Sequence, residues 1–159
     1  GIAILLETLT DNKNRTSSTI RSTFTKSGGN MAESGSVMWQ FSQKGIVIVD
    51  AQEDLAEEMA LTAIDAGADD FETYDSTLEI FAAPSNLEEV RRALTGKSAE
   101  IRSSELAMIP QNTVMLDSKT AKQTLRLMDL LEDLDDVQKV YSNADFPDEA
   151  LSEYGNESQ

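Results

Sequence analysis

Short apolar runs alternate with amphipathic stretches along the chain, and this alternation limits what the chain can fold into. Apolar residues at every second position are typical of strands, and apolar residues at every third or fourth position are typical of helices. Residues 2–6 form a purely apolar run that predicts a buried strand. Ile20 and Phe24 lie one helical turn apart and predict the buried stripe of a helix over residues 15–27. The sequence therefore predicts small sheets covered by helices.

A hairpin is predicted next, because residues 36–42 alternate apolar and polar side chains and residues 46–49 form a second apolar run. Lys44 and Gly45 would make its turn. The remaining elements follow from the same two periods and from the Gly and Pro residues at their ends. They are helices over residues 50–66, 87–96 and 119–134, and strands over residues 71–75, 78–82, 99–109, 113–116 and 137–141.

Two helix starts and one helix face are predicted in more detail. Ser85 and Glu88 have the spacing of a capping box, in which each side chain accepts a hydrogen bond from the other's backbone N–H. Asp117 or Ser118 is expected to cap the helix over residues 119–134. The inner face of that helix is expected to carry Leu127, Leu130, Leu131 and Leu134.

The order of elements is β-α-β-β, then α-β-β-α-β, then β-α-β, which indicates an α+β architecture. The middle block is self-contained, whereas the first and last blocks look incomplete alone. We therefore predict two small ferredoxin-like (split βαβ) sandwiches, one discontinuous with the other inserted into it. The discontinuous domain comprises residues 1–49 and 113–159, and the inserted domain comprises residues 50–112. After Asn143 the sequence becomes polar and acidic, and we expect it to fray.

The composition removes whole classes of chemistry. The chain of 159 residues has no Cys and no His, which excludes disulfides, thiol nucleophiles, Ser-His-Asp triads and metal sites with His or Cys ligands. No apolar run approaches the roughly 18 residues that a membrane span needs, so we expect no membrane partner. Thirteen Lys and Arg against 29 Asp and Glu give a net charge of −16. A uniformly acidic domain of this kind would be repelled by nucleic acid.

The charge is not uniform along the chain. Residues 1–49 carry five Lys and Arg against three Asp and Glu, a net of +2. Residues 50–112 carry four against fifteen, a net of −11, and residues 113–159 carry four against eleven, a net of −7. One interpretation is that the acidity only keeps the protein soluble. The other is that the first third faces an anion while the rest faces solvent or a basic protein.

Neither the Gly-rich segment nor the acid pairs indicate a catalytic or metal site. Residues 28–36 are Gly-rich but follow a helix and precede a strand, whereas a phosphate-binding loop runs from a strand into a helix. We therefore expect a connector there. Adjacent carboxylates usually point apart and are explained by solvation and capping, so no cofactor, metal or enzymatic activity is predicted. The pairs are Glu57-Glu58, Asp69-Asp70, Glu88-Glu89 and Asp135-Asp136.

The remaining candidate is a group of cations and amides around the predicted junction between the first strand and the first helix. Exposed helix amides, amide side chains and cations together can contact phosphate groups. The alternative is that Asp11 and Asn14 only cap the helix and that the cations are ordinary solvated surface. The candidate nucleic-acid-binding residues are Asn12, Lys13, Asn14, Arg15, Arg21 and Lys26, with Lys44 in the predicted hairpin turn.

Several segments, in order along nearly the whole chain, resemble the YebC/PmpR family. They are residues 10–16 (TDNKNRT), 28–37 (GGNMAESGSV), 66–69 (AGAD), 108–114 (MIPQNTV) and 131–143 (LEDLDDVQKVYSN). The chain departs from the family at Met31-Ala32, where Leu-Gly is common, and in its acidic tail. The resemblance implies three domains, a basic helical one followed by two α+β domains, of which this chain resembles only the second and third.

The resemblance also implies a function, because the family is described both as DNA-binding transcriptional regulators and as ribosome-associated factors that relieve stalling in translation. We therefore expect a cytoplasmic, non-enzymatic regulator that binds rRNA, tRNA or DNA (in the mitochondrial matrix for an organellar relative). The alternative is an acidic interaction module for a basic protein partner, such as a ribosomal protein. No recognition helix can be identified in the sequence, which weakens sequence-specific DNA reading by these two domains.

Overall fold

The computed structural model describes residues 1–33 and 35–157, and the chain divides into two compact units. The discontinuous unit comprises Gly1–Phe41 and Pro110–Gln159, and the inserted unit comprises Ser42–Ile109. The predicted boundaries lay at residues 49/50 and 112/113. The first boundary differs because β2 (Phe41–Asp50) is one unbroken strand that belongs almost entirely to the inserted unit.

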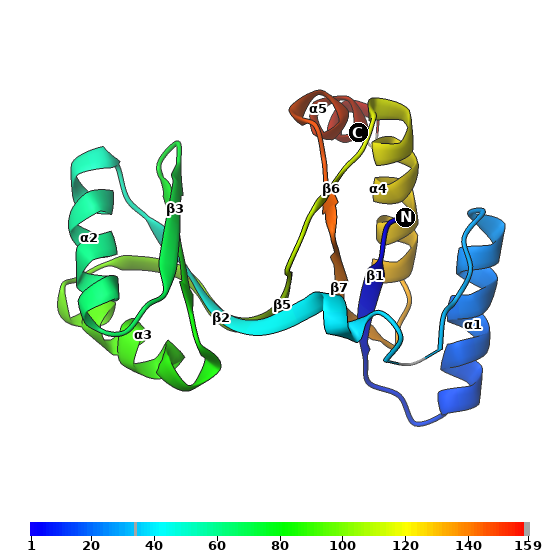
Figure 1. The fold of residues 1–159 in the computed structure, drawn as a ribbon, viewed down its shortest axis with the longest axis horizontal. Coiled ribbons are helices and arrows are strands. Elements are labelled where there is room, and N and C mark those ends of the chain that lie inside the picture. The colour runs from blue at the N-terminus through cyan, green and yellow to red at the C-terminus, as the bar shows by residue number, and fades with distance from the viewer. Residues whose placement is uncertain (34, 158–159) are drawn as a thin grey trace. The chain divides into compact units, whose positions relative to one another are not determined.

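The inserted unit contains one four-stranded sheet with two helices packed against it (Figure 1). Its strands are β2, β3 (Asp70–Tyr74), β4 (Thr77–Ala82) and β5 (Glu100–Pro110), in the spatial order β3-β4-β2-β5. Its helices are α2 (Glu53–Asp65) and α3 (Leu87–Gly96). Strand β4 pairs antiparallel with both β2 and β3. This β-α-β-β-α-β order is that of a split βαβ sandwich, as the sequence predicts.

The core of the inserted unit is aliphatic and explains its stability as a unit. In β4 the inward positions Leu78 and Ile80 are fully buried, and they alternate with partly exposed neighbours as a half-buried strand requires. Each buried aliphatic side chain of this size contributes about 1.5–3 kcal/mol through removal from water. The helices supply Met59, Ala60, Ala63, Val90 and Leu94 to the same core.

The predicted hairpin at Lys44-Gly45 is wrong. Residues Met38–Gln40 form a short 3₁₀ helix, η1, and Phe41–Asp50 run on as a single strand through both turn residues. Gly45 is buried, and a Cβ placed on it would lie 2.8 Å from the Leu87 Cβ, so this glycine allows a helix to approach the strand closely. The Lys-Gly pair predicted a turn, but in the structure this glycine lies within a strand and gives α3 room to pack against it.

The predicted capping box at Ser85 and Glu88 is also wrong. Pro84–Asn86 form a 3₁₀ turn, η2, and α3 begins at Leu87 without a side-chain cap. Glu88 instead forms ion pairs with Arg91 and Arg92 within the helix. Asn86 donates from its amide nitrogen to the Gly67 carbonyl, which ties η2 to the end of α2.

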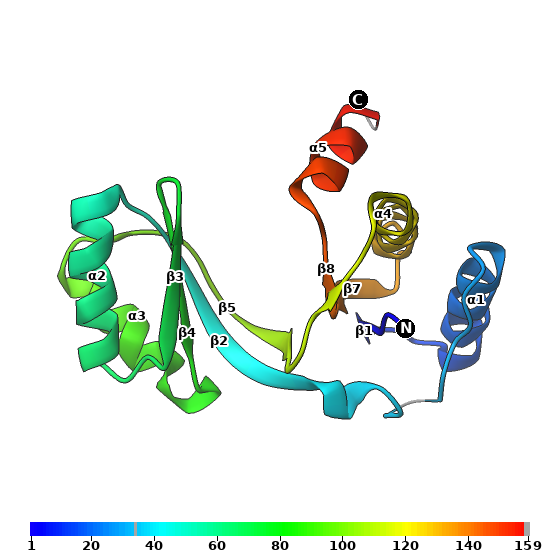
Figure 2. The same cartoon turned by 45° about the horizontal axis from the view of Figure 1, so that its top comes forward.

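The discontinuous unit combines segments from both ends of the chain (Figures 1 and 2). Its strands form two short ladders, an antiparallel pair β1-β7 and a parallel pair β6-β8. The strands are β1 (Ile4–Thr8), β6 (Val114–Met115), β7 (Val137–Ser142) and β8 (Ala144–Asp145). The helices are α1 (Lys13–Lys26), α4 (Ser118–Glu132) and α5 (Asp148–Glu157).

The helices of this unit cover two small cores. Ile20 of α1 packs with Leu131 of α4 and Val137 of β7. Leu116, Ala121 and Ala150 form the second core, under α5. Asp117 caps α4 as predicted, by accepting a hydrogen bond from the Thr120 N–H.

Two expectations about the end of this unit are wrong. Leu130 is about half exposed because it lies at the rim of the inner face of α4. The segment after Asn143 forms β8 and α5 and does not fray, because Ala150 is fully buried and Lys122 of α4 forms an ion pair with Glu153. Residues 158–159 lie outside the described part of the chain.

Across the described residues, none of the helices combines the length and the apolar character that crossing a membrane requires.

Candidate nucleic-acid interface

Helix α1 carries four cations and no acid, in a chain whose net charge is strongly negative. It begins at Lys13, two residues before the predicted start, because the Asn12 side chain accepts a hydrogen bond of 3.1 Å from the Arg15 N–H. Asn12 therefore caps the helix, where the sequence suggested Asp11 or Asn14. A capped start fixes the position of the first turn and of the cations on it.

One stripe of α1 holds the helix against the rest of the discontinuous unit. Thr16 and Ile20 are buried, and Phe24 one turn later packs against the same core. The Thr16 hydroxyl donates to the Asp136 carboxylate over 2.6 Å, which links the helix to the start of β7. This stripe turns the opposite face of α1 to solvent.

The solvent face of α1 carries the cations that remain without an acidic partner. Asn14 and Arg21 lie two turns apart along one side of this face, and Lys26, five residues after Arg21, lies toward its other side. All three are exposed, as is Lys13 at the start of the helix. Within residues 1–33 and 35–157, Lys13, Arg21 and Lys26 form neither an ion pair nor a side-chain hydrogen bond. The structure thus brings three of the predicted cations to one exposed helix.

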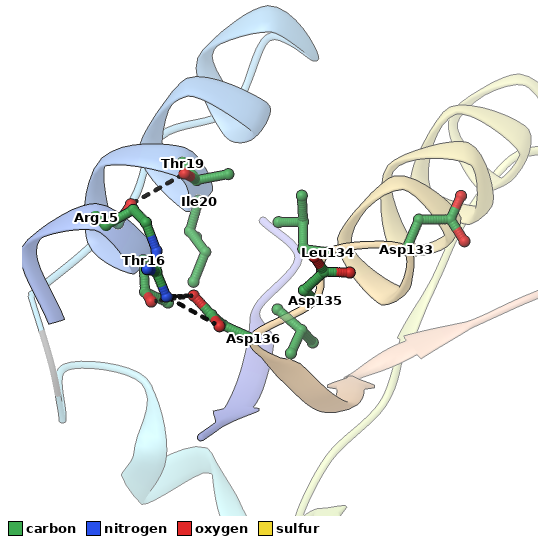
Figure 3. A pocket seen from close by; sticks show the side chains of 9 residues that line it. Arg15, Thr16, Thr19, Ile20, Asp133, Leu134, Asp135 and Asp136 are labelled. Atoms are coloured by element: carbon green, nitrogen blue, oxygen red, sulfur yellow. Dashed lines mark hydrogen bonds and ion pairs between the residues drawn. The ribbon is translucent and has the colours of Figure 1, made fainter. Parts of the chain in front are cut away.

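Arg15 has a different environment, because two carboxylates bind its guanidinium. Its Nη2 lies 2.9 Å from Asp11 Oδ1 and 3.1 Å from Asp136 Oδ2. Figure 3 shows Arg15 and Thr16 both turned toward Asp136. The hydrogen bond from Thr16 lowers the pKa of the Asp136 carboxyl most, followed by the one from Arg15. In turn, the Asp136 and Asp11 carboxylates raise the pKa of Arg15. Arg15 therefore links α1 to the residue that precedes β7.

A hollow of about 510 Å³ lies between α1 and the connection from α4 to β7 (Figure 3). It is lined by Arg15 and three aspartates, with Thr16, Thr19 and the apolar residues Ile20, Leu134 and Val137. The aspartates are Asp133, Asp135 and Asp136. Three carboxylates against one arginine repel a phosphate, so the hollow is unsuited to bind an anion.

Lys44 does not belong with the α1 cations. It lies in β2 of the inserted unit, and its ammonium lies 2.8 Å from the Asp69 carboxylate of the same unit. Sequence reasoning placed it in a turn, where a lysine would be free to reach a ligand. Its place within β2 puts it in a strand, with an acidic partner close by.

The Gly-rich segment is a connector, as expected from its position after a helix. Gly28 has a φ of +85°, which suits glycine, and its N–H bonds to the Thr25 carbonyl at the end of α1. Ser34 of this segment lies outside the described residues.

The acid pairs are dispersed or bound within the protein. Asp69 and Glu88 pair with cations of the inserted unit, and Asp136 pairs with Arg15. In the described part of the chain, no cluster of three or more acidic residues has an arrangement that could hold a metal ion.

Comparisons with known proteins agree with this fold and give it a family. The model of the TACO1/YebC second and third domain matches residues 1–144. A protein named "Probable transcriptional regulatory protein" from Halothermothrix orenii is 49% identical over 99% of this chain and 63% of its own length. One of that name from Maridesulfovibrio salexigens is 44% identical over 96% of this chain and 62% of its own length.

A solved structure is similar in fold as well as in sequence. The crystal structure of a conserved hypothetical protein from Aquifex aeolicus superposes with a TM-score of 0.83 and 38% identity, over 93% of this chain and 61% of that one. The chain spans under two thirds of the length of these relatives. By the match of the family model and by these relatives, the chain belongs to the TACO1/YebC family and contains its second and third domains.

Proposed function

We propose that the chain is a non-enzymatic regulator of gene expression and that the solvent face of α1 binds the phosphate backbone of a nucleic acid. The observation that carries this proposal is that Lys13, Arg21 and Lys26 are all exposed on a helix without acids. The names of the curated relatives support a regulatory role.

The chemistry of α1 suits phosphate contact without base reading. Lysine and arginine side chains that have no carboxylate partner within the protein can neutralise phosphates of a nucleic acid. This releases the counterions condensed on the nucleic acid and drives binding whatever the base sequence. Serine hydroxyls at Ser18 and Ser22 lie on the same exposed face and can donate to phosphate oxygens. Both rRNA or tRNA and DNA offer this backbone, so the proposal covers either target.

The test is a triple substitution on α1 with a matched control. Lys13→Ala, Arg21→Ala and Lys26→Ala together should weaken binding to an RNA or DNA oligonucleotide by at least about tenfold at low salt. The control removes three exposed cations elsewhere, with Lys97→Ala, Lys119→Ala and Arg126→Ala, and changes the net charge by the same amount. Equal weakening by both triple variants would refute a specific role for α1, since only the total charge would then matter.

A second candidate function follows from the inserted unit. It carries five Lys and Arg against fifteen Asp and Glu, a net of −10, and Leu61 lies exposed on the acidic solvent face of α2. Such a surface would attract a basic protein segment. Titration of the chain with a lysine-rich peptide tests this candidate. Binding that weakens with salt and with Asp54→Asn and Glu58→Gln would support it, and no binding would remove it.

A further inference from the structure

The only tryptophan of the chain is among its most exposed apolar side chains. Trp39 lies in η1 of the discontinuous unit and is 71% exposed, and its neighbour Met38 is 49% exposed. The sequence pattern placed Trp39 on the same strand face as Val37 and Phe41, but the 3₁₀ turn separates it from Phe41, which is buried. Tryptophan is buried to a large extent in most proteins, so this exposure needs a reason.

The indole ring is held in place by its own polar group. Trp39 Nε1 donates a hydrogen bond of 3.0 Å to the Ser36 carbonyl, three residues earlier. The one hydrogen-bond donor of the side chain is therefore used within the chain. The flat aromatic surface of the ring remains available to a ligand, and this surface is suited to stacking and not to hydrogen bonding.

The backbone under Trp39 is anchored to the core of the unit. The Gln40 N–H closes the 3₁₀ turn onto the Val37 carbonyl, and the Gln40 carbonyl accepts a hydrogen bond of 2.8 Å from the Gln111 N–H. The Gln40 side chain accepts a further bond from the buried Asn143. A ring mounted on a fixed turn loses little conformational freedom when it stacks on a ligand.

The segment of sequence that leads to Trp39 is poor in acids, which suits a polyanionic ligand. From Asn12 to Phe41, within the discontinuous unit, the sequence holds four Lys and Arg and one acid, Glu33, although acids outnumber cations more than twofold over the whole chain. Helix α1 and η1 belong to the same unit, in which η1 is linked through Asn143 to the start of β1, whereas α1 follows the end of β1. A strand that contacts α1 would have to extend along β1 to reach the exposed ring of Trp39 as well.

We infer that Trp39 is a stacking platform for an unpaired nucleobase, so that the chain prefers single-stranded nucleic acid to a duplex. This inference rests on the proposed function, because α1 supplies the phosphate contacts. Stacking accepts any base and contributes affinity that salt does not screen. In a duplex the bases are already stacked on each other and leave no free face for the ring.

The fluorescence of Trp39 gives a direct test, since no other tryptophan contributes to the signal. The whole chain is titrated with oligothymidylate, with oligouridylate and with a duplex of equal length. We expect both single strands to quench the fluorescence and the duplex to leave it unchanged. Trp39→Leu should weaken single-strand binding about tenfold and leave its salt dependence unchanged, whereas Trp39→Phe should retain most of the affinity.

The outcomes separate this inference from the proposed function. Salt-sensitive binding that needs the α1 cations but leaves the fluorescence and the Trp39→Leu affinity unchanged would refute stacking alone. Equal affinity of the Trp39→Leu and Trp39→Phe variants would mean that an apolar contact suffices, and would also refute stacking. Binding of neither strand nor duplex would refute both claims.

Discussion

Asn143 is buried and joins three segments of the discontinuous unit by hydrogen bonds. It is 3% exposed, its Oδ1 accepts a hydrogen bond of 2.9 Å from the Ala3 N–H, and its amide nitrogen donates to the Gln40 side chain. Its carbonyl accepts a bond of 2.7 Å from the Val114 N–H. One side chain and its backbone thus join the start of β1, η1 and β6.

Asn143→Ala should lower the free energy of unfolding by about 1–3 kcal/mol, because it leaves the buried Ala3 N–H without a partner. Urea unfolding followed by the fluorescence of Trp39, in the same unit, measures this change. Asn112→Ala is the matched control, since Asn112 is exposed and should change the stability by less than about 0.5 kcal/mol. An Asn143→Ala variant as stable as this control would contradict the assigned role.

The contact of Asp136 with Thr16 and Arg15 should make part of the stability depend on pH. Hydrogen bonds from these side chains lower the pKa of Asp136 below its ordinary value of 3.8. A group whose pKa is lowered on folding stabilises the protein above its unfolded pKa, and this contribution is lost as the pH falls through the folded pKa. The contact therefore acts at neutral pH and disappears in acid.

Comparison of urea midpoints near neutral pH and at about pH 3 tests this expectation. Asp136→Asn should be less stable than the unaltered chain at neutral pH and should lose less stability on acidification. Asp135→Asn, next to it but without a hydrogen bond to α1 among the described contacts, serves as the control and should behave like the unaltered chain. Parallel loss of stability in all three proteins would show that Asp136 contributes nothing.

Sequence reasoning could predict the cations of α1 but not which of them are free. Lys13, Arg15, Arg21 and Lys26 are equivalent as residues in a basic segment. Arg15 differs because Asp136, 121 positions later, lies beside it once β1 and β7 pair. No local pattern carries information about such a distant partner, and the same holds for Asn143 and Ala3.

Two glycines of the inserted unit should respond to alanine in opposite directions. In Gly45→Ala the added Cβ would lie 2.8 Å from the Leu87 Cβ, so we expect a loss of about 1–3 kcal/mol from overpacking between β2 and α3. Gly96 is in the last turn of α3 with open space around it, so Gly96→Ala should raise the stability by up to about 1 kcal/mol. Thermal unfolding followed by circular dichroism measures both. A neutral Gly45→Ala would mean that α3 does not approach β2 this closely.

The elements that the sequence predicted correctly are those with a clear apolar period and a marked end. Strand β4 alternates the buried Leu78 and Ile80 with partly exposed neighbours, and the turn before it is made by Asp75, whose φ is +51°. The wrongly predicted elements are those in which the apolar pattern covers only a few residues. Three alternating apolar residues suggested a strand at η1, and α5 has too few apolar residues for its burial to be read from sequence.

Over the whole molecule, the charge separates into an acidic inserted unit and a discontinuous unit of mixed charge. The inserted unit has a net charge of −10, and the discontinuous unit has eight Lys and Arg against fourteen Asp and Glu, a net of −6. Within the discontinuous unit α1 alone contributes +4. The proposed function therefore predicts that a polyanion makes its main favourable contacts at α1, because the rest of the chain carries a net negative charge.

The salt dependence of nucleic-acid binding tests this claim most directly. The dissociation constant of the unaltered chain is measured over a range of salt concentrations, alongside the α1 triple variant and the matched triple variant of Lys97, Lys119 and Arg126. Each phosphate contact contributes about 0.7 to 0.9 to the slope of log affinity against log salt. We predict that the α1 variant loses about two to three units of slope while the control keeps it. Identical slopes for all three proteins would contradict the claim.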